Sequence, residues 1–263
     1  MNVYRKEIKV YCRSLFFWAL GVLLFIAASA TKYSAMANDP AALGIFTQLP
    51  LGLQAMFGVG HLDYTTAIGF YGMIYPYLVL MAAIHASMLG AVILSKEERD
   101  KTSEFLYVKP AARTRILTAK LLAALTMVTF FCLLIAAYSA GMVRAFGESA
   151  DAQIARLIAG LYLLQLLFLA VGFTAAAVVK HPKAATGIAA GFMLSTYILS
   201  IAIDVNGGIN WAKVFTPFAY FDAKLIIGNG EGLNLWYILL CVSLATGLTA
   251  WAYLRFPQRD LQV

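Results

Sequence analysis

The apolar residues of this chain are gathered into six long runs rather than into short alternating stretches. A run of about 20 apolar residues is the length that an α-helix needs to cross the hydrocarbon core of a membrane. Membrane-spanning strands are about half as long and alternate apolar with polar residues, so the pattern argues against a barrel. We therefore expect an all-α integral membrane protein with six transmembrane helices. The predicted spans cover residues 15–31, 67–94, 116–143, 154–179, 184–203 and 235–254.

The composition agrees with this fold class. Hydrophobic residues make up 62% of the 263 residues and charged residues only 13%, whereas an ordinary soluble domain carries about 25% charge. Six spans use about 120 residues, and the remainder suffices only for loops and helix ends. We expect one transmembrane domain over residues 1–263 and no large soluble domain. The net charge of +7 lies mainly in short segments between spans, which indicates a membrane surface rather than nucleic acid as its partner.

The first 14 residues predict an amphipathic helix in the membrane interface. One helical face carries Tyr4, Ile8 and Tyr11, and a second stripe carries Arg5, Lys9 and Arg13. Such a two-faced basic helix is typical of an interfacial element; the alternative is a basic flank that only orients span 1. Span 1 ends in Ala28-Ser29-Ala30, which resembles a signal-peptidase site. A cleaved signal peptide is thus the alternative to a span, and we interpret the segment as a span.

The distribution of basic residues predicts the orientation. With the N-terminus inside, the inner segments hold 15 of the 20 Lys and Arg residues and the outer segments hold 5. Inner loops of membrane proteins are enriched in Lys and Arg. We therefore expect a multi-pass protein of the plasma (inner) membrane with both termini in the cytoplasm.

Several kinds of catalytic site have no counterpart in the sequence. It contains no GxxxxGK[ST], HExxH or GxSxG motif. The three histidines lie in different segments and the three cysteines form no CxxC, so we expect no metal and no cofactor in this chain. A membrane-embedded enzyme remains an alternative. No span centre carries an acidic residue, which lowers the expectation of an ion-coupled secondary transporter but leaves it as another alternative.

The segment between spans 2 and 3 is the most charged part of the chain, yet it contains Phe105, Leu106 and Val108. Apolar residues among charges in a cytoplasmic loop favour a short helix that docks onto a partner. We predict this helix over Thr102–Tyr107, with the Thr102 hydroxyl as its N-cap and Pro110 ending it. The alternative is a solvated run of charges. Lys120, which opens span 3, is expected to extend its ammonium to the membrane surface.

This segment resembles the signature of type-2 ATP-binding-cassette (ABC) exporter permeases, in particular bacterial ones. The matching residues are Glu97, Glu98, Thr102, Glu104, Leu106, Pro110, Arg113 and Lys120; Lys101 stands where the family usually has Gly. The resemblance extends over most of the chain. Its further matches are the stretch from Leu49-Pro50 to Phe57-Gly58, Leu62-Asp63, Gly69-Phe70, the stretch from Thr216 to Phe221, and Arg259-Asp260-Leu261.

The resemblance implies a six-span permease half that pairs with a second half, identical or homologous, and with two separate ATPase subunits that bind ATP and Mg. It implies an N-terminal interfacial helix and a coupling helix between spans 2 and 3, with spans 2 and 5 near the dimer axis. The cargo would be hydrophobic or amphipathic, such as a drug, peptide or lipid. The expected ATPase-coupling residues are Glu97, Glu98, Thr102, Glu104, Phe105, Leu106, Pro110 and Arg113, with a second cytoplasmic contact at His181, Pro182 and Lys183. Candidates for the translocation path or dimer axis are Pro76, His85, Gly187, Gly191 and Tyr197.

Two of these candidates have a plainer interpretation as well. His85 is a polar residue within span 2, where a hydrogen bond to a neighbouring helix is the alternative to a functional role. Gly187 and Gly191 form a GxxxG pattern in span 5. Small residues at this spacing let helices approach closely, and the approach can occur within one subunit or across a dimer axis.

Overall fold

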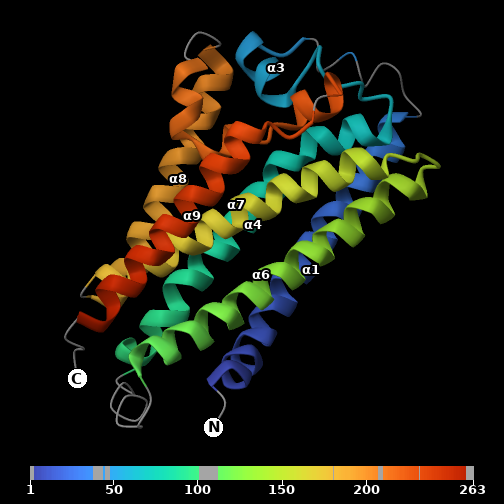
Figure 1. The fold of residues 1–263 in the computed structure, drawn as a ribbon. Helices are drawn as coiled ribbons and strands as arrows, with labels where there is room; N and C mark the ends of the chain where they lie inside the picture. Colours follow the sequence, from blue (N-terminus) through green and yellow to red (C-terminus); the bar gives the residue numbers. More distant parts are fainter. Residues whose placement is uncertain are drawn as a thin grey trace.

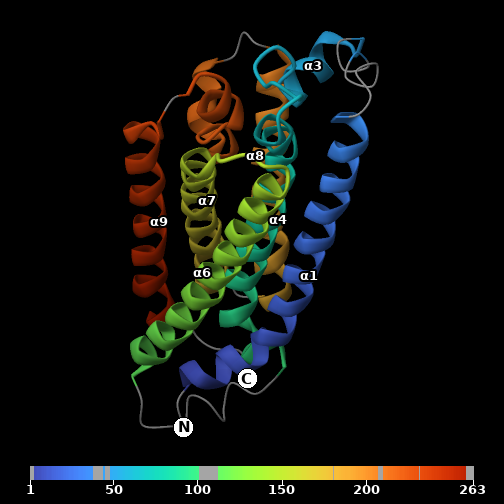
Figure 2. The ribbon, with the colours of Figure 1, turned by 90° about the vertical axis from the view of Figure 1, so that its right-hand side faces the viewer.

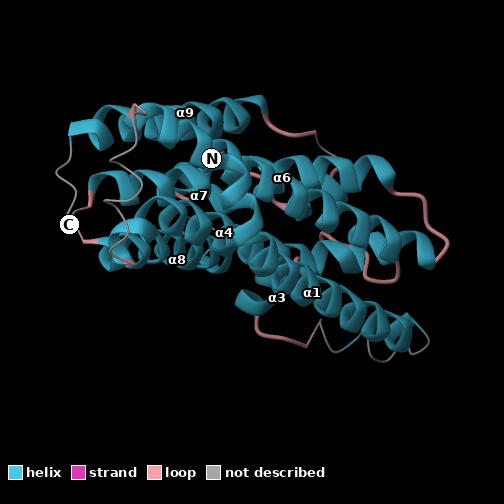
Figure 3. Ribbon diagram, turned by 90° about the horizontal axis from the view of Figure 1, so that it is seen from below, coloured by secondary structure: helices cyan, strands magenta, loops and turns pink. Residues whose placement is uncertain are grey.

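The computed structural model describes residues 3–37, 44, 48–100, 112–179, 181–206, 210–230 and 232–258, and no strand occurs among them. Six of its helices are long and apolar enough to cross a membrane, which confirms the all-α class and the six predicted spans. They are α1 (Val3–Ala37), α4 (Ala67–Arg99), α6 (Arg113–Ala145), α7 (Asp151–Val178), α8 (Pro182–Asn206) and α9 (Leu235–Arg255). Figure 3, coloured by secondary structure, shows the described chain as helices joined by loops.

The long helices form a bundle whose two ends differ. The start of α1 and the end of α9 lie at the same end, which we call the termini end (Figure 1). The opposite end, the α3 end, holds the short elements α3 (Leu51–Phe57), the 3-10 helices η1 (Asn210–Phe215) and η2 (Pro217–Ala219), and one turn of π-helix, η3 (Lys224–Gly228). A last 3-10 turn, η4 (Phe256–Gln258), follows α9. An even number of spans returns the chain to the end where it started.

The N-terminal segment and span 1 form one continuous helix, α1, with no break between the two predicted elements. Its first turns run at an angle to the remainder (Figure 2). The predicted two faces are present: the stripe of Tyr4, Ile8 and Tyr11 packs against the core, and the basic stripe is exposed. Glu7 departs from this pattern, because it is 1% exposed.

Helix α4 lies at the centre of the bundle and contacts α1, α6, α7 and α8. Its buried residues point in all directions around the helix axis, and Tyr71, Tyr75 and Leu78 are among the most buried side chains of the protein. Its N-terminus is capped by the Thr66 hydroxyl, which accepts from the Gly69 N–H at 3.1 Å. The Glu148 carboxylate, from the α6–α7 connection, accepts two further free N–H groups of this first turn at 2.6 and 3.0 Å. A carboxylate at a helix N-terminus is favourable because the helix dipole is positive there.

Helices α4 and α7 pack closely against each other through two glycines. A Cβ on Gly90 would collide with the carbonyl oxygen of Leu169, and a Cβ on Gly172 would collide with that of Ser87. Small residues at such contacts let two backbones approach. The GxxxG glycines of α8 differ, because a Cβ on Gly187 or Gly191 would meet no atom of another element within 4 Å among the described residues.

Candidate functional site

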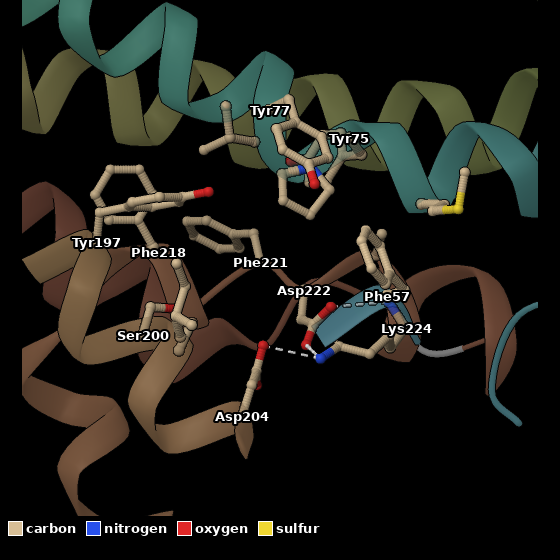
Figure 4. Close-up of a pocket in the computed structure, with 16 residues that line it drawn as sticks. Phe57, Tyr75, Tyr77, Tyr197, Ser200, Asp204, Phe218, Phe221, Asp222 and Lys224 are labelled. Carbon is tan, nitrogen blue, oxygen red and sulfur yellow. Dashed lines mark hydrogen bonds and ion pairs between the residues drawn. The ribbon is translucent and has the colours of Figure 1, made fainter. Parts of the chain in front are cut away.

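A pocket opens between α4, α8 and the η2–η3 segment, towards the α3 end (Figure 4). We call it the aromatic pocket. Six aromatic side chains line it, namely Phe57, Tyr75, Tyr77, Tyr197, Phe218 and Phe221. Its volume of about 60 Å³ has room for a few water molecules or a small head group, but not for a whole drug-sized ligand.

The walls of the aromatic pocket come from segments far apart in the sequence. Tyr75 and Tyr77 lie on either side of Pro76 in α4. From α8, the Tyr197 ring meets Phe218 of η2 edge-on at 5.1 Å between centroids. The segment that carries Phe218 is held to α8 by the Thr216 hydroxyl, which donates to the Thr196 carbonyl at 2.7 Å.

Three charged side chains lie at one side of this pocket. The Lys224 ammonium binds the Asp204 carboxylate at 3.0 Å and the Asp222 carboxylate at 3.3 Å, as Figure 4 shows. Burial lowers the pKa of Lys224, but the carboxylates of Asp222 and Asp204 outweigh burial and leave that pKa above its ordinary value. The lysine is therefore held as a cation. We call these three residues the charged triad.

The structure brings together two of the residues predicted for the translocation path. Pro76 and Tyr197 both line the aromatic pocket, although more than a hundred residues separate them. The charged triad was not predicted. Asp222 and Lys224 are two residues apart, but Asp204 lies near the end of α8, on a different element. Sequence spacing therefore does not relate Asp204 to the other two, and only the tertiary structure places them together.

His85 lies apart from the aromatic pocket, on the side of α4 that faces α1 and α6. Its ring is 5.7 Å from Trp18 and 4.5 Å from Phe131, between centroids. It is 4% exposed, and its Nδ1 has no hydrogen-bond partner in the described part of the chain. It borders a separate cavity of about 130 Å³, which Tyr11 also lines.

A second group of charged residues lies near the termini end, where α1, α4 and α6 meet. We call Glu7, Lys96, Glu97 and Lys120 the ionic cluster. The Lys120 ammonium binds Glu97 at 2.5 Å, the carbonyl oxygen of Ile93 at 2.5 Å and Glu7 at 3.7 Å. Lys96 pairs with Glu7 and lies 5.0 Å above the ring of Tyr11.

The ionic cluster is both buried and balanced. Lys120 is fully buried, and Glu7 and Glu97 are 1% and 5% exposed. Two acids and two bases leave no net charge, which is the condition under which buried charges are tolerated. The expectation that Lys120 extends to the membrane surface is wrong, because α1 covers this position and Glu7 and Glu97 provide internal partners. Glu7, which the sequence interpretation overlooked, was recognisable as the one acid within the basic N-terminal stretch.

The predicted coupling residues fall partly outside the described residues. Five of them lie outside the described residues, namely Thr102, Glu104, Phe105, Leu106 and Pro110. The helix predicted over this segment therefore stays a prediction. Glu97 and Glu98 are not in the loop but in the last turns of α4, and both are buried.

The remaining predicted contact residues lie at the termini end. Arg113 begins α6 and donates to the carbonyl oxygen of Pro257, after α9, at 3.2 Å. His181 is exposed at the start of α8, where its carbonyl accepts the Ala184 N–H at 3.0 Å, and Pro182 and Lys183 form the first turn of that helix.

Comparison with known proteins identifies one family. The family model described as "ABC-2 family transporter protein" matches residues 1–261. No curated protein matches the chain.

Proposed function

Since the chain belongs to the ABC-2 family of transporter proteins, we propose that it is the permease half of an ATP-driven exporter. Two such halves, identical or homologous, would form the translocation path, and two separate ATPase subunits would bind ATP and Mg. The match of the family model to almost the whole chain carries this proposal. The sequence contains no P-loop, so an ATP-driven transporter built from this chain would take its ATPase from a separate subunit.

The ionic cluster suggests how motion of the motor could reach the membrane. Its residues lie on both sides of the proposed coupling segment: Glu97 is near the end of α4 and Lys120 near the start of α6. Glu7 adds α1 to the same network. A displacement of the coupling segment would therefore move three helices together rather than one.

The aromatic pocket and the open face of α8 suggest where the path lies. The pocket is bounded by α4 and α8, the second and fifth spans. Ile188, Phe192 and Ile198 of α8 are about half exposed or more in the single chain, and the glycines beside them have open space. We propose that this face meets the second half, and that a hydrophobic or amphipathic cargo passes between α4 and α8.

The proposed setting is the plasma (inner) membrane with both termini in the cytoplasm. The 15 to 5 division of basic residues supports this orientation. The coupling segment, the ionic cluster and His181 would then share the cytoplasmic side, where an ATPase subunit has access to them.

Affinity purification from native membranes tests the proposed assembly. The tagged permease should bring down a P-loop ATPase subunit, identified by mass spectrometry. Phe105→Ala with Leu106→Ala should weaken that association about a hundredfold or more, because burying each side chain is worth about 1.5–3 kcal/mol. Phe130→Ala with Leu133→Ala is the matched control, since both residues are exposed on α6. If Phe105→Ala with Leu106→Ala associates with the ATPase as wild type does, the segment is only a solvated linker.

Crosslinking tests the position of α8. Single cysteines at Gly191 or Ile198, in a background without Cys12, Cys132 and Cys241, should give a covalent dimer in membranes if the halves are identical. A cysteine at Leu239, exposed on α9, is the control. Monomers at several α8 positions would contradict a homodimeric axis there.

The two alternative functions have tests of their own. Transport that follows a proton gradient without an ATPase would favour a secondary transporter, and substrate turnover without ATP would favour a membrane-embedded enzyme.

A further inference from the structure

The chemistry of the aromatic pocket restricts the charge of the group that it can take. Among the described residues that line it, two are acidic and one is basic, so the lining carries a net charge of −1. Lys213, whose field reaches Asp204 from η1, does not line the pocket. The faces of aromatic rings are electron-rich, so they attract cations and repel anions. The net charge of the lining and its aromatic rings therefore both favour a positively charged ligand.

The charged triad already shows which group these carboxylates accept. The ammonium of Lys224 is held by Asp204 and Asp222 at 3.0 and 3.3 Å. Both carboxylates are mainly buried, with side-chain exposures of 27% and 23%. A ligand ammonium of similar size would meet the same partners, and it would have the six aromatic rings around its carbon atoms.

Hard inorganic cations are less suited to this site. Calcium takes six to eight oxygen ligands and magnesium requires near-octahedral oxygen coordination. The described lining offers two carboxylates, and most of the remaining side chains are aromatic or aliphatic. An ammonium that carries carbon groups satisfies both kinds of wall, because its charge meets the carboxylates while its carbon atoms meet the rings.

We propose that the aromatic pocket binds the ammonium head group of an amphipathic organic cation, in competition with the side chain of Lys224. This inference rests on the proposed function, and it deepens it by naming the class of cargo. The volume of about 60 Å³ suits a head group, with the apolar part of the cargo outside the pocket along the exposed face of α8. Lys224 is then a built-in competitor that leaves when the cargo enters.

The competition predicts effects of opposite sign for two neutralising substitutions. The probe is a dansyl-labelled primary alkylammonium, compared with the dansyl-labelled carboxylate of equal chain length. Binding is measured by fluorescence on the full-length protein in nanodiscs of zwitterionic lipid. Asp204→Asn should weaken binding of the cationic probe about tenfold, whereas Lys224→Gln should tighten it about tenfold, because one charge is removed at contact distance in each. Asp204→Asn with Lys224→Gln restores the net charge of −1, and its affinity should return towards that of wild type.

Matched controls separate the local charge from the total charge. Lys32→Gln and Asp151→Asn change the same net charges at exposed positions and should leave binding unchanged. If Lys224→Gln does not fold, Asp222→Asn is the second variant, and it should weaken the cationic probe as Asp204→Asn does. Tighter binding of the carboxylate probe, or equal affinities across all variants, would overturn the proposal.

The two hypotheses fail separately in this design. Probe binding needs the permease alone, whereas the proposed function is tested by association with an ATPase. If the permease associates with an ATPase but the substitutions do not change the affinity for the cationic probe, only the cargo class is overturned. If the affinity changes as expected but no ATPase associates, the exporter assignment is overturned and the binding site stands.

Discussion

At the scale of single residues, Lys120 shows how tertiary contacts decide whether a lysine near a helix end reaches the membrane surface or is buried. A lysine near the end of a transmembrane helix usually reaches the membrane surface. Here α1 covers it, so its ammonium is buried and bound by Glu97, Glu7 and a carbonyl oxygen. Burial of the charge is tolerated because its partners are within the same cluster.

Lys120→Met should destabilise the protein strongly. The substitution leaves Glu7 and Glu97 with Lys96 as the remaining base of the ionic cluster, and breaking a buried pair from one side typically costs about 3–5 kcal/mol. We expect a clear fall in the melting temperature in detergent. Lys32→Met, at an exposed position of α1, should leave it near wild type. A melting temperature of Lys120→Met equal to that of wild type would mean that the cluster does not stabilise the fold.

A charge-balanced variant checks the cause. Lys120→Met with Glu97→Gln removes one base and one acid, so the cluster again carries no net charge. It should recover part of the stability that Lys120→Met loses. No recovery would show that the packing of the Lys120 stem, rather than charge balance, explains the effect.

At the scale of elements, the same small-residue chemistry serves two helices differently. Gly90 and Gly172 let α4 and α7 touch backbone to backbone inside the chain. Gly187 and Gly191 of α8 have open space at the same kind of position. The first pair therefore stabilises the subunit, and the second pair is available for a neighbour.

Alanine substitutions distinguish these two roles. Gly172→Ala places a methyl group against the Ser87 carbonyl, and overpacking of this kind costs about 1–3 kcal/mol. Its melting temperature should fall. In Gly187→Ala the added methyl group meets no atom of another described element within 4 Å, so the stability of the isolated subunit should change by less than about 0.5 kcal/mol. A comparable loss in both variants would contradict the distinction.

At the scale of the whole molecule, the two groups of polar residues lie towards opposite ends of the bundle. The termini end holds the ionic cluster and the start of α8, and the α3 end holds the aromatic pocket and the short elements around it. α4 connects them, because Lys96 and Glu97 near its end belong to the ionic cluster and Tyr75 and Tyr77 line the pocket. A tilt of α4 would therefore move residues of both the ionic cluster and the aromatic pocket.

The arrangement of the termini predicts a topology that reporters can measure. The α6–α7 connection lies at the α3 end, opposite the end of α9 (Figure 1). A reporter after Val263 should therefore be cytoplasmic, and one inserted within residues 144–153 should lie outside. Reporters on the same side would contradict six membrane crossings. If the reporter after Val263 lies outside and the one within residues 144–153 is cytoplasmic, the fold is kept but the orientation is the reverse of the one that the basic residues predict.

Much of the fold was predictable from the sequence because membrane crossing is a local property. Each span must satisfy its own backbone hydrogen bonds, so the length and apolarity of a run of residues suffice to predict a helix. For the same reason the two faces of residues 3–14 were predictable from helical spacing. The ends of the spans were less predictable: α4 continues to Arg99, since buried pairing of Glu97 lets the helix run on through charged residues.

Which polar residues meet was decided by the tertiary structure alone. Sequence spacing gave no reason to join Glu7 to Lys120, or Asp204 to Lys224, since these residues lie on different elements. Pro76 and Tyr197 were candidates from the family resemblance, but only the packing of α8 against α4, and of η2 against α8, makes them walls of one pocket. His85 was a candidate of the same kind, and packing placed it between α1 and α6 instead. The physical reason is that hydrophobicity along one helix determines that it enters the membrane, whereas contacts between helices depend on shape and charge across all of them at once.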